Sequence, residues 1–548
     1  MAVQSNVYGE EIYRIALGQG IYTAELASNI PDGFSAQAFN LVATGDSLEN
    51  RMGIRPSSVD YKKTHVNAPS GFNHRFFQLR TGDAAYPQWA WVNITTGNDS
   101  TMSFIRGGLP GGGSGDGYME IDMSAIEPPT GICSYNDRIY FSCVGVGTHR
   151  ITNFNWTADT ITYTLLGSSA GVHGLFSFKD RLWGWLGDQL YFTEIAATGG
   201  YPETWNTATN FINFRGPNGY SVIMDIKVIG NRLLVFTQSG LFSLIVEGQP
   251  QSWILRMLDG DSISTHPNSA FEAKNIVYYA NTQGVWATNG LYTTNLSRVI
   301  EDQFFVGVGR RIHTLNAYED GMILSIGKLD DTSRFDAPNC RVFYSKLDPI
   351  AWTEWGIHNP DGTVNAFASS RLCFVYSVTR KLNCFLTNDP TVFVLSSVTD
   401  STPASAQDTT FQLSIMDGGE NKMYDRGVTL RTEPLNLFLK TKYIDGGNPY
   451  ADKRNKEAKL ELFTSDSQHI ITTSWDADAS TLASIRSASL TDFVVGGGSN
   501  LIRVKSDFMY RRCALQLKTS LQTNDSQIKI KDLAILQDTG RMEAEQVR

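Results

Sequence analysis

The sequence has few charged residues and no long apolar run. Charged side chains make up 18% of the 548 residues and apolar ones 41%, a balance typical of packed globular chains and not of disordered ones. No stretch reaches the roughly 18 consecutive apolar residues of a membrane-spanning helix, so we expect no membrane span. Long segments with the 3.6-residue apolar period of amphipathic helices are also scarce, which disfavours a mainly helical fold.

Cysteine is sparse and lacks metal-binding spacing. No two of the six cysteines form a C-x-x-C pair. Three of them lie in or beside apolar strand-like runs, so we interpret the cysteines as buried free thiols of a reducing cytoplasm. Disulfide bridges would need an extracellular setting, and residues 1–11 lack the basic and apolar regions of a secretion signal. The cysteines are Cys133, Cys143, Cys340, Cys373, Cys384 and Cys513.

The motifs of common catalytic and metal sites are missing as well. The eight histidines include no pair at helical ligand spacing and no H-E-x-x-H, and no G-x-S-x-G occurs. Asp259-Gly260-Asp261 lacks the carboxylate spacing of a calcium-binding loop and predicts a turn. We therefore predict a protein that is not an enzyme, with no cofactor and no catalytic, cofactor-binding or metal-binding residue. A carboxylate pair for glycoside hydrolysis leaves no local sequence trace, so a glycosidase stays open as the enzymatic alternative.

The net charge of −9 disfavours a sequence-specific DNA-binding protein. Such proteins neutralise phosphates with clustered Lys and Arg side chains. An acidic wall would instead repel DNA and let it slide, as a conduit requires.

Aromatic and glycine residues are plentiful, with 29 Phe, 22 Tyr, 11 Trp and 49 Gly. Aromatic residues favour strands and glycines favour the turns between them, so we predict an all-β protein. Exposed aromatic rings could also stack on sugars, although packing in a core is the default for rings in alternating strands. The best candidate for a short helix is Ser297 to Phe305, with Ser297 as the N-cap.

A repeat organises the middle of the chain. Six times, a turn-like pair or triple of residues precedes an apolar strand, and a second strand follows a short glycine-bearing turn. The equivalent positions 138, 181, 232, 275, 321 and 371 are separated by 43, 51, 43, 46 and 50 residues. This period, with about four strands per unit, is typical of β-propeller blades. The alternative is a β-sandwich or meander with accidental spacing.

The turn before each strand often reads Asn or Asp followed by Arg, as in Asn136-Asp137-Arg138 and Lys179-Asp180-Arg181. We interpret this pair as a β-turn without chemistry, because it recurs wherever the turn recurs. The repeat predicts a propeller-like domain of about 6 blades, within a range of 5 to 8.

The prediction divides the chain into three parts. Residues 1–130 form an N-terminal β-rich platform segment, residues 131–427 the propeller, and residues 428–548 a C-terminal β-sandwich-like platform segment. The last stretch of the propeller, 396–427, is rich in Ser, Thr, Asp and Gly and reads as a connector or an irregular last blade. The N- and C-terminal segments together are expected to flank the propeller as one platform.

Two segments are predicted to be irregular. The glycine-rich stretch 107–117 reads as a flexible loop, and not as a phosphate-binding loop, because no Lys-Ser or Lys-Thr pair follows and no helix begins there. Residues 539–548 are polar and read as a disordered or partner-docking tail.

Three segments resemble one protein family. Residues 38–56, AFNLVATGDSLENRMGIRP, are similar to an N-terminal motif of the tail nozzle proteins of short-tailed bacteriophages, the tail tubular protein B type, and of related packaged-DNA-stabilisation proteins. Residues 178–206, from Phe178-Lys179-Asp180-Arg181-Leu182 to Pro202-Glu203-Thr204-Trp205, look like a blade that recurs in those proteins. Residues 503–542 look like their C-terminal β-domain.

The resemblance implies a structural virion protein that forms the tail nozzle or tube, retains the genome and conducts it during ejection. It implies a homohexameric ring with cyclic, head-to-tail interfaces, which we expect from residues 1–130 and 428–548. DNA would pass between subunits without sequence specificity. The implied partners are a tail adaptor protein, tail fibre proteins and needle or plug proteins, and the implied location is the virion tail, after assembly in the host bacterial cytoplasm.

The leading alternative is a propeller at the tail tip that binds a host receptor or glycan. Propellers serve many functions, so the fold alone does not decide between the two. The family has no catalytic residues to carry over.

Overall fold

The computed structural model describes most of the chain, in separate segments. The described residues are 4–5, 10–24, 29–51, 55–56, 62–66, 73–79, 87, 89–94, 101–105, 118–123, 129–158, 160–216, 219–260, 270–281, 283–305, 310–318, 320–328, 340–355, 370–374, 384–386, 392–400, 408–415, 424–426, 432–444, 453–465, 469–478, 488–510, 512–521 and 527–538. The glycine-rich stretch 107–117 and the C-terminal residues 539–548 lie outside them.

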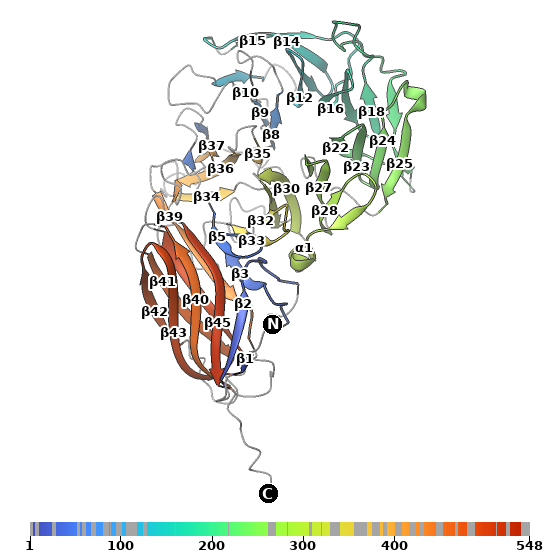
Figure 1. Ribbon diagram of the computed structural model, residues 1–548. Coiled ribbons are helices and arrows are strands. Elements are labelled where there is room, and N and C mark those ends of the chain that lie inside the picture. The colour runs from blue at the N-terminus through green and yellow to red at the C-terminus, as the bar shows by residue number, and fades with distance from the viewer. Residues whose placement is uncertain are drawn as a thin grey trace.

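The protein is nearly all-β, and four-stranded antiparallel sheets follow one another around a ring (Figure 1). The first contains β8 (Asn73–Gln78), β9 (Trp89–Ile94), β10 (Thr101–Ile105) and β11 (Tyr118–Asp122). The second contains β12 (Pro129–Tyr135), β13 (Arg138–Cys143), β14 (Gly147–Asn155) and β15 (Thr160–Leu165). The third contains β16 (His173–Phe178), β17 (Arg181–Leu186), β18 (Gln189–Phe192) and β19 (Phe211–Asn213).

Three more blades continue the ring. The fourth contains β22 (Ile223–Ile229), β23 (Arg232–Thr237), β24 (Gly240–Ile245) and β25 (Ile254–Asp259). The fifth contains β26 (Ala270–Ala273), β27 (Ile276–Asn281), β28 (Gly284–Thr288) and β29 (Thr293–Asn295). The sixth contains β30 (Arg310–Tyr318), β31 (Gly321–Lys328), β32 (Cys340–Lys346) and β33 (Trp352–Trp355). A small ribbon of β20 (Arg215–Gly216) and β21 (Gly219–Tyr220) joins the third blade to the fourth.

A seventh sheet closes the ring and combines strands from distant parts of the chain. β37 pairs on one side with β36, which pairs with β34 and β35, and on the other side with the N-terminal strands β6 and β7. β35 contacts both β30 and β8, the inner strands of the sixth and first blades. The strands are β6 (Arg55–Pro56), β7 (Lys62–Val66), β34 (Ser370–Phe374), β35 (Cys384–Leu386), β36 (Val392–Asp400) and β37 (Asp408–Ile415).

The propeller-like fold is therefore confirmed, but its predicted start is wrong. Among the described residues the ring has seven sheets, within the expected range of 5 to 8, and it begins at β6 and not at residue 131. The sequence pattern missed the first blade because ten residues separate β8 from β9, whereas two residues separate the first and second strands of each of the next five blades. Of the two interpretations of residues 396–427, the described strands β36 and β37 support an irregular last blade.

Each blade buries both faces of its sheet against its neighbours, as a ring of sheets requires. In β23, Leu233 and Val235 pack in a cluster shared with the third blade, whereas Leu234 and Phe236 pack in a cluster shared with the fifth. In β13, Tyr140 likewise faces the third blade, while its neighbours in sequence face the first. The second strand of a blade is for this reason an almost continuous buried run.

The turn between the first and second strands has the backbone that the sequence predicts. Both residues of the pair have positive φ at Lys179 (47°) and Asp180 (56°), and again at Lys274 (54°) and Asn275 (60°). Two-residue hairpins with positive φ at both positions match the twist of antiparallel strands. Lysine is an unfavourable residue there, because its Cβ crowds the backbone in the left-handed region.

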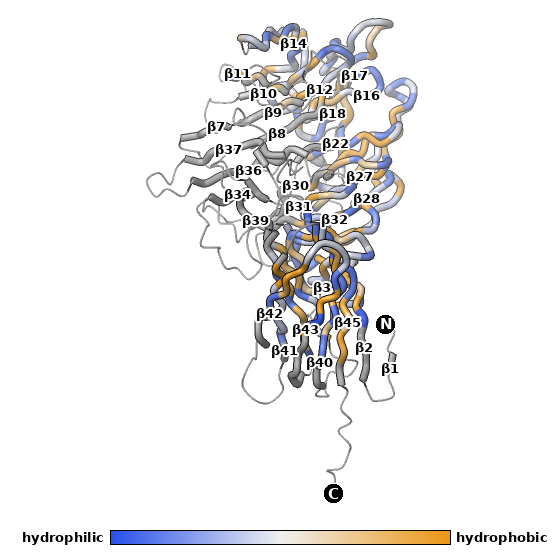
Figure 2. The backbone as a smooth tube through the Cα atoms, turned by 60° about the vertical axis from the view of Figure 1, so that its left-hand side comes forward, coloured by the Kyte–Doolittle hydropathy of each residue, from blue (hydrophilic) through white to orange (hydrophobic). Residues whose placement is uncertain are grey.

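The platform is built from both ends of the chain. β2 (Glu10–Ala16) pairs with β1 (Gln4–Ser5) and with the C-terminal strand β45 (Ile528–Asp538), and β45 continues to β40 (Lys453–Thr464) and β43 (Gly498–Tyr510). The second platform sheet contains β39 (Thr432–Thr441), β44 (Arg512–Leu521), β41 (His469–Asp478) and β42 (Ala488–Val495), with β38 (Tyr424–Arg426) paired to β39. The tube in Figure 2 shows the long platform strands below the ring, beside the N-terminus. Both ends of the chain contribute to the platform, as predicted, but its N-terminal part ends before β6, because β6 to β11 belong to the ring.

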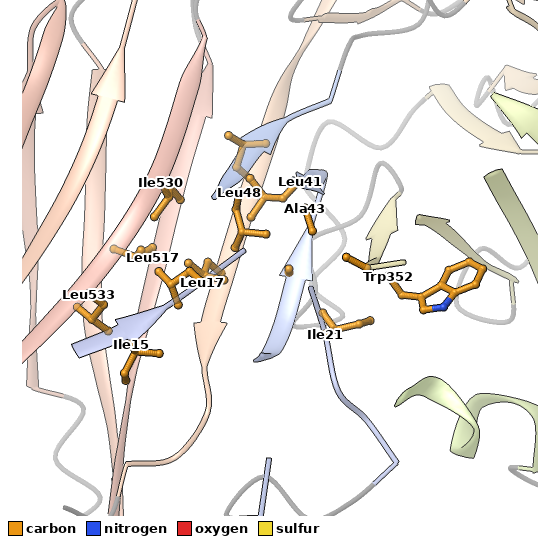
Figure 3. Packing of buried hydrophobic residues seen from close by; sticks show 14 of the residues in the cluster. Ile15, Leu17, Ile21, Leu41, Ala43, Leu48, Trp352, Leu517, Ile530 and Leu533 are labelled. Carbon is orange, nitrogen blue, oxygen red and sulfur yellow. The ribbon is translucent and has the colours of Figure 1, made fainter. Parts of the chain in front are cut away.

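One strand joins the platform to the propeller. β3 (Ser35–Phe39) pairs antiparallel with β39 and in parallel with β33, so a single ten-stranded sheet runs from the sixth blade into the platform. The core under this junction collects apolar side chains from both parts, including Leu41, Trp352 and Ile530 (Figure 3). β4 (Leu41–Ala43) and β5 (Leu48–Asn50) follow as a hairpin, and β5 pairs with β45.

A buried arginine completes this junction. Arg51 is 1% exposed, and its Nε donates a hydrogen bond to Asn40 Oδ1 at 2.8 Å. Its guanidinium lies 6.0 Å from the ring centre of Trp355, and the Trp355 indole donates a hydrogen bond to the carbonyl of Leu41 at 2.9 Å. Asn40 has a φ of 57°, and its backbone N–H donates a hydrogen bond to the Glu354 carbonyl at 2.8 Å. Asn40 and Arg51 both belong to the segment 38–56.

The predicted helix is present but begins differently. A 3₁₀ turn at Arg298–Ile300 precedes α1 (Asp302–Phe305). Ser297 occupies the N-cap position without making a capping hydrogen bond, so the N-cap prediction is wrong. Its hydroxyl instead accepts a hydrogen bond from the backbone N–H of Val285 at 2.8 Å, which secures the loop after β29 to β28. Cys133, Cys143 and Cys513 are buried free thiols as predicted.

Replacing Arg51 with alanine should lower the free energy of unfolding by about 2–4 kcal/mol, because it leaves a cavity and removes the hydrogen bond to Asn40. Arg51→Lys should lower the free energy of unfolding by less, since lysine keeps the positive charge and the aliphatic part of the side chain but lacks the planar guanidinium group. Urea titrations of the three proteins test this. Equal stability of Arg51→Ala and the parent would contradict the role of Arg51 in the junction.

Replacing Lys274 with glycine should raise the free energy of unfolding by roughly 0.5–1 kcal/mol, because glycine adopts positive φ without steric cost. Lys274→Ala is the matched control: it removes the same exposed side chain but keeps the Cβ and the strain. If both variants were equally stabilised in urea titrations, the gain would come from the side chain and not from φ.

Candidate functional site: arginine contacts between neighbouring blades

Two sets of loops meet on one face of the ring. In a four-stranded antiparallel blade, the turn after the first strand and the loop after the third strand lie at the same end of the sheet. We call this end the turn face. It carries the turns at 136–137, 179–180, 230–231 and 274–275 and the loops 193–210, 246–253 and 289–292.

The arginine that begins β13 reaches the loop of the next blade. Arg138 Nη1 lies 2.6 Å from Glu203 Oε1, and Arg150 Nη1 lies 2.9 Å from Glu203 Oε2. The Tyr140 hydroxyl also donates a hydrogen bond to Glu203 Oε1, at 2.8 Å. Glu203 thus accepts from three donors of the second blade while its own loop belongs to the third. The side chains of Arg138, Arg150 and Glu203 are 30%, 28% and 22% exposed, so this is a half-buried cluster.

Aromatic rings extend the cluster toward solvent. The Arg138 guanidinium lies over the Tyr201 ring, 3.3 Å from its centre, and the Tyr201 hydroxyl donates a hydrogen bond to Asp137 at 2.6 Å. Tyr135 meets Tyr201 edge-on and donates a hydrogen bond to Asp180 at 2.9 Å. Each turn acidic residue therefore has an aromatic hydroxyl as partner.

Burial and hydrogen bonds shift the pKa values of two donors of the cluster, Tyr140 and Arg138. Burial and then the hydrogen bond to Glu203 raise the pKa of Tyr140 far above its usual range. Burial alone would lower the pKa of Arg138, but the hydrogen bond and the charge of Glu203 outweigh it and raise that pKa. With its oxygens occupied by three donors, Glu203 is suited to holding two blades together and not to taking a proton from a substrate.

The next arginine in the repeat makes an equivalent contact. Arg181, at the start of β17, donates a hydrogen bond to the carbonyl of Thr193 in its own blade. Its guanidinium lies 5.7 Å from the ring centre of Trp253, in the loop of the fourth blade, and 5.3 Å from that of Phe192. Burial lowers the pKa of Arg181, an effect that the charge of Glu194 opposes.

The third arginine repeats the pattern with a backbone acceptor. Arg232, at the start of β23, donates a hydrogen bond from Nη1 to the carbonyl of Gly290 in the loop of the fifth blade, at 3.1 Å. Gly290 has a φ of 83°. The neighbouring Asn289 side chain accepts hydrogen bonds from the backbone N–H groups of Leu291 and Tyr292, at 3.0 and 3.4 Å.

The Asp/Asn-Arg pair therefore has two roles, and the sequence pattern predicted only the turn. The first position forms the turn, as predicted, and the arginine connects its blade to the following one. The available signal was the arginine itself, since a turn alone does not require that residue in three successive units. Trp205, of the family-like segment, is buried between the second and third blades and pairs with Thr193 in an isolated bridge.

The other residues considered from the sequence form no metal-binding site among the described residues. Within them, no group of three or more His, Cys, Asp or Glu side chains is placed to hold a metal ion. Asp259 accepts a hydrogen bond from Thr293 at 3.5 Å, and Asp261 lies outside the described residues. No helix in this part of the chain is long and apolar enough to span a membrane.

Comparisons with known proteins add no functional assignment. No family model and no curated protein matches the chain. Among solved structures, YCF48 bound to D1 peptide is 9% identical, with a TM-score of 0.34, and the match covers 65% of this chain and 97% of that one. Hsv2 from Kluyvelomyces marxianus is 9% identical, with a TM-score of 0.30 and coverage of 63% and 97%. An exo-beta-1,3-galactanase from Phanerochaete chrysosporium is 8% identical, with a TM-score of 0.22 and coverage of 74% and 95%.

Replacing Glu203 with alanine should lower the free energy of unfolding by about 1–3 kcal/mol, since it removes the acceptor of two arginines and a tyrosine at a half-buried site. Glu247→Ala is the matched control, because Glu247 is an exposed glutamate in the equivalent loop of the next blade, where it accepts a hydrogen bond from the neutral side chain of Asn231. The control should change stability by less than about 0.5 kcal/mol. Equal effects of both variants in urea titrations would show that Glu203 does not hold the blades together.

Proposed function

We propose that this protein is a structural component of the tail of a short-tailed bacteriophage, forming the nozzle or tube that retains the DNA genome and conducts it during ejection. The observation that carries the proposal is where the family-like residues lie. Asn40 and Arg51 hold the propeller to the platform, and Arg181 and Glu203 hold blades to one another. The resemblance therefore includes residues that stabilise the contacts between parts of the fold, and not only residues of turns and loops.

The architecture suits a load-bearing subunit. A continuous sheet joins propeller and platform through β3, which pairs along its length with β39 and at Phe39 with Glu354 of β33. Six copies in a closed ring would need two different complementary surfaces on each subunit. We expect these on the platform, with the tail adaptor, tail fibre and needle or plug proteins as further partners. The net charge of −9 fits a lumen that passes DNA without binding it.

One observation favours the alternative of a receptor- or glycan-binding propeller at the tail tip. Leu291 and Tyr292 are 67% and 66% exposed at the turn face, on a loop held by the Asn289 side chain. An exposed aromatic ring on a rigid loop is the kind of platform on which a sugar can stack. A glycosidase would need, in addition, a carboxylate pair across a cleft.

The deciding experiment is electron microscopy of virions, and of the purified protein mixed with its tail partners. We expect six-fold rings at the distal end of the tail, with a lumen that admits duplex DNA, and density for the platform at the contacts between subunits. Single copies or trimers on fibres would contradict the nozzle proposal. Binding of the isolated protein to host surface saccharides, lost in Tyr292→Ala, would then support the alternative.

A further inference from the structure

The outer strand of the fourth blade is an exposed apolar edge. β25 pairs with β24 on one side only, and among the described residues no strand covers its other side. Ile254, Leu255 and Met257 are 45%, 38% and 39% exposed, so side chains on both faces of the strand reach solvent. Figure 1 shows β25 on the outer rim of the ring. An edge of this kind presents unpaired N–H and C=O groups to any extended chain that approaches.

The fold already extends blades in this way at two other places. The outer strand of the sixth blade, β33, accepts β3 as a parallel neighbour. In the seventh sheet, β37 accepts β6 and β7. Strand addition at an outer blade edge is therefore a contact that this architecture accommodates without disturbing the ring.

β25 differs from the other open outer edges. β19 and β29 are three residues long, β11 carries two carboxylates, and β15 alternates threonine with apolar residues and carries no charged side chain. β25 has six residues, Ile-Leu-Arg-Met-Leu-Asp, and no proline or lysine of the kind that protects edges from association. The register with β24 is regular from Ile254 to Met257, and the irregularity comes only after Met257. Four residues thus offer a flat template.

The charge at the centre of this template indicates what binds there. Arg256 is exposed, and it makes no ion pair or side-chain hydrogen bond with the described residues. An arginine flanked by apolar side chains on a strand is complemented by a carboxylate on the neighbouring strand. The backbone groups require an extended peptide, and the apolar neighbours require alternate apolar side chains on it.

We propose that β25 is a docking edge for an extended segment of a partner protein, one with alternating apolar residues and a carboxylate that faces Arg256. The segment adds to the fourth blade as a fifth strand. Its backbone hydrogen bonds provide most of the affinity, and the ion pair with Arg256 selects the register. This inference does not depend on the phage function, because it follows from the edge alone.

Two capped eight-residue peptides test the proposal. Both alternate valine and threonine, and the fourth residue is glutamate in one and lysine in the other, in place of a threonine. Hydrogen exchange of the full-length protein is measured with each. We expect the glutamate peptide to protect the amides of β25 and of no other outer strand, and the lysine peptide to protect them at least about tenfold less well.

The variant Arg256→Glu should reverse this preference, because it inverts the charge that faces the peptide. Arg298→Glu is the matched control: Arg298 is also exposed, lies far from β25 in the sequence, and changes the net charge equally. Circular dichroism verifies that both exposed substitutions leave the fold intact. A retained tenfold preference in Arg298→Glu and its inversion in Arg256→Glu support the proposal.

Three results would overturn it. The first is no protection of β25 by either peptide at millimolar concentration. The second is equal protection by both peptides in the parent and in Arg256→Glu, which would show that binding does not require a carboxylate opposite Arg256. The third is concentration-dependent protection of β25 without any peptide, together with dimers in sedimentation experiments, which would make a second copy of the chain the occupant. None of these results bears on whether six-fold rings form.

Discussion

The position of the propeller relative to the platform depends on the backbone pairing at both edges of β3. One edge of this strand pairs with the propeller and the other with the platform, so rotating the two parts against each other would break hydrogen bonds that have no alternative partners in the core. Asn40 and Arg51 fill the space beside the strand and give its end a fixed direction. The N-terminal segment then returns to the platform through β5 and enters the seventh sheet as β6 and β7. The segment from β3 to β7 thereby pairs with the platform, with the sixth blade and with the sheet that closes the ring.

Two kinds of interaction stabilise the ring. Apolar side chains on both faces of each second strand hold neighbouring sheets together and supply most of the burial. The arginine contacts on the turn face then fix how the loops of one blade lie against the turn of the blade before it. Outer edges and the exposed side chains of the loops remain outside both sets. They are therefore the places where recognition can vary on a constant scaffold, and β25 and the Leu291–Tyr292 loop are such places.

The predictable part of the fold was local in origin. Turn residues and glycines recur at blade spacing because each hairpin needs positive φ at the same point, as at Lys179-Asp180 and Lys274-Asn275. The first blade escaped prediction because ten residues separate its first two strands, whereas the next five blades have two there, so its spacing did not match the repeat. The N-cap at Ser297 failed for a related reason: its hydroxyl serves the N–H of Val285, a partner that local sequence rules do not include.

The sequence by itself determined the β character, the period of the blades, the turns between first and second strands and the burial of Cys133, Cys143 and Cys513, because each depends on residues within one hairpin or one strand. Only the tertiary structure decided that β6 and β7 close the ring, that β3 bridges two bodies, and that Arg138 and Arg150 share the carboxylate of Glu203. These partners are separated by 53 to more than 300 residues. Side-chain spacing along the chain carries no information at that range, since the ring and the platform must form before the partners come within reach.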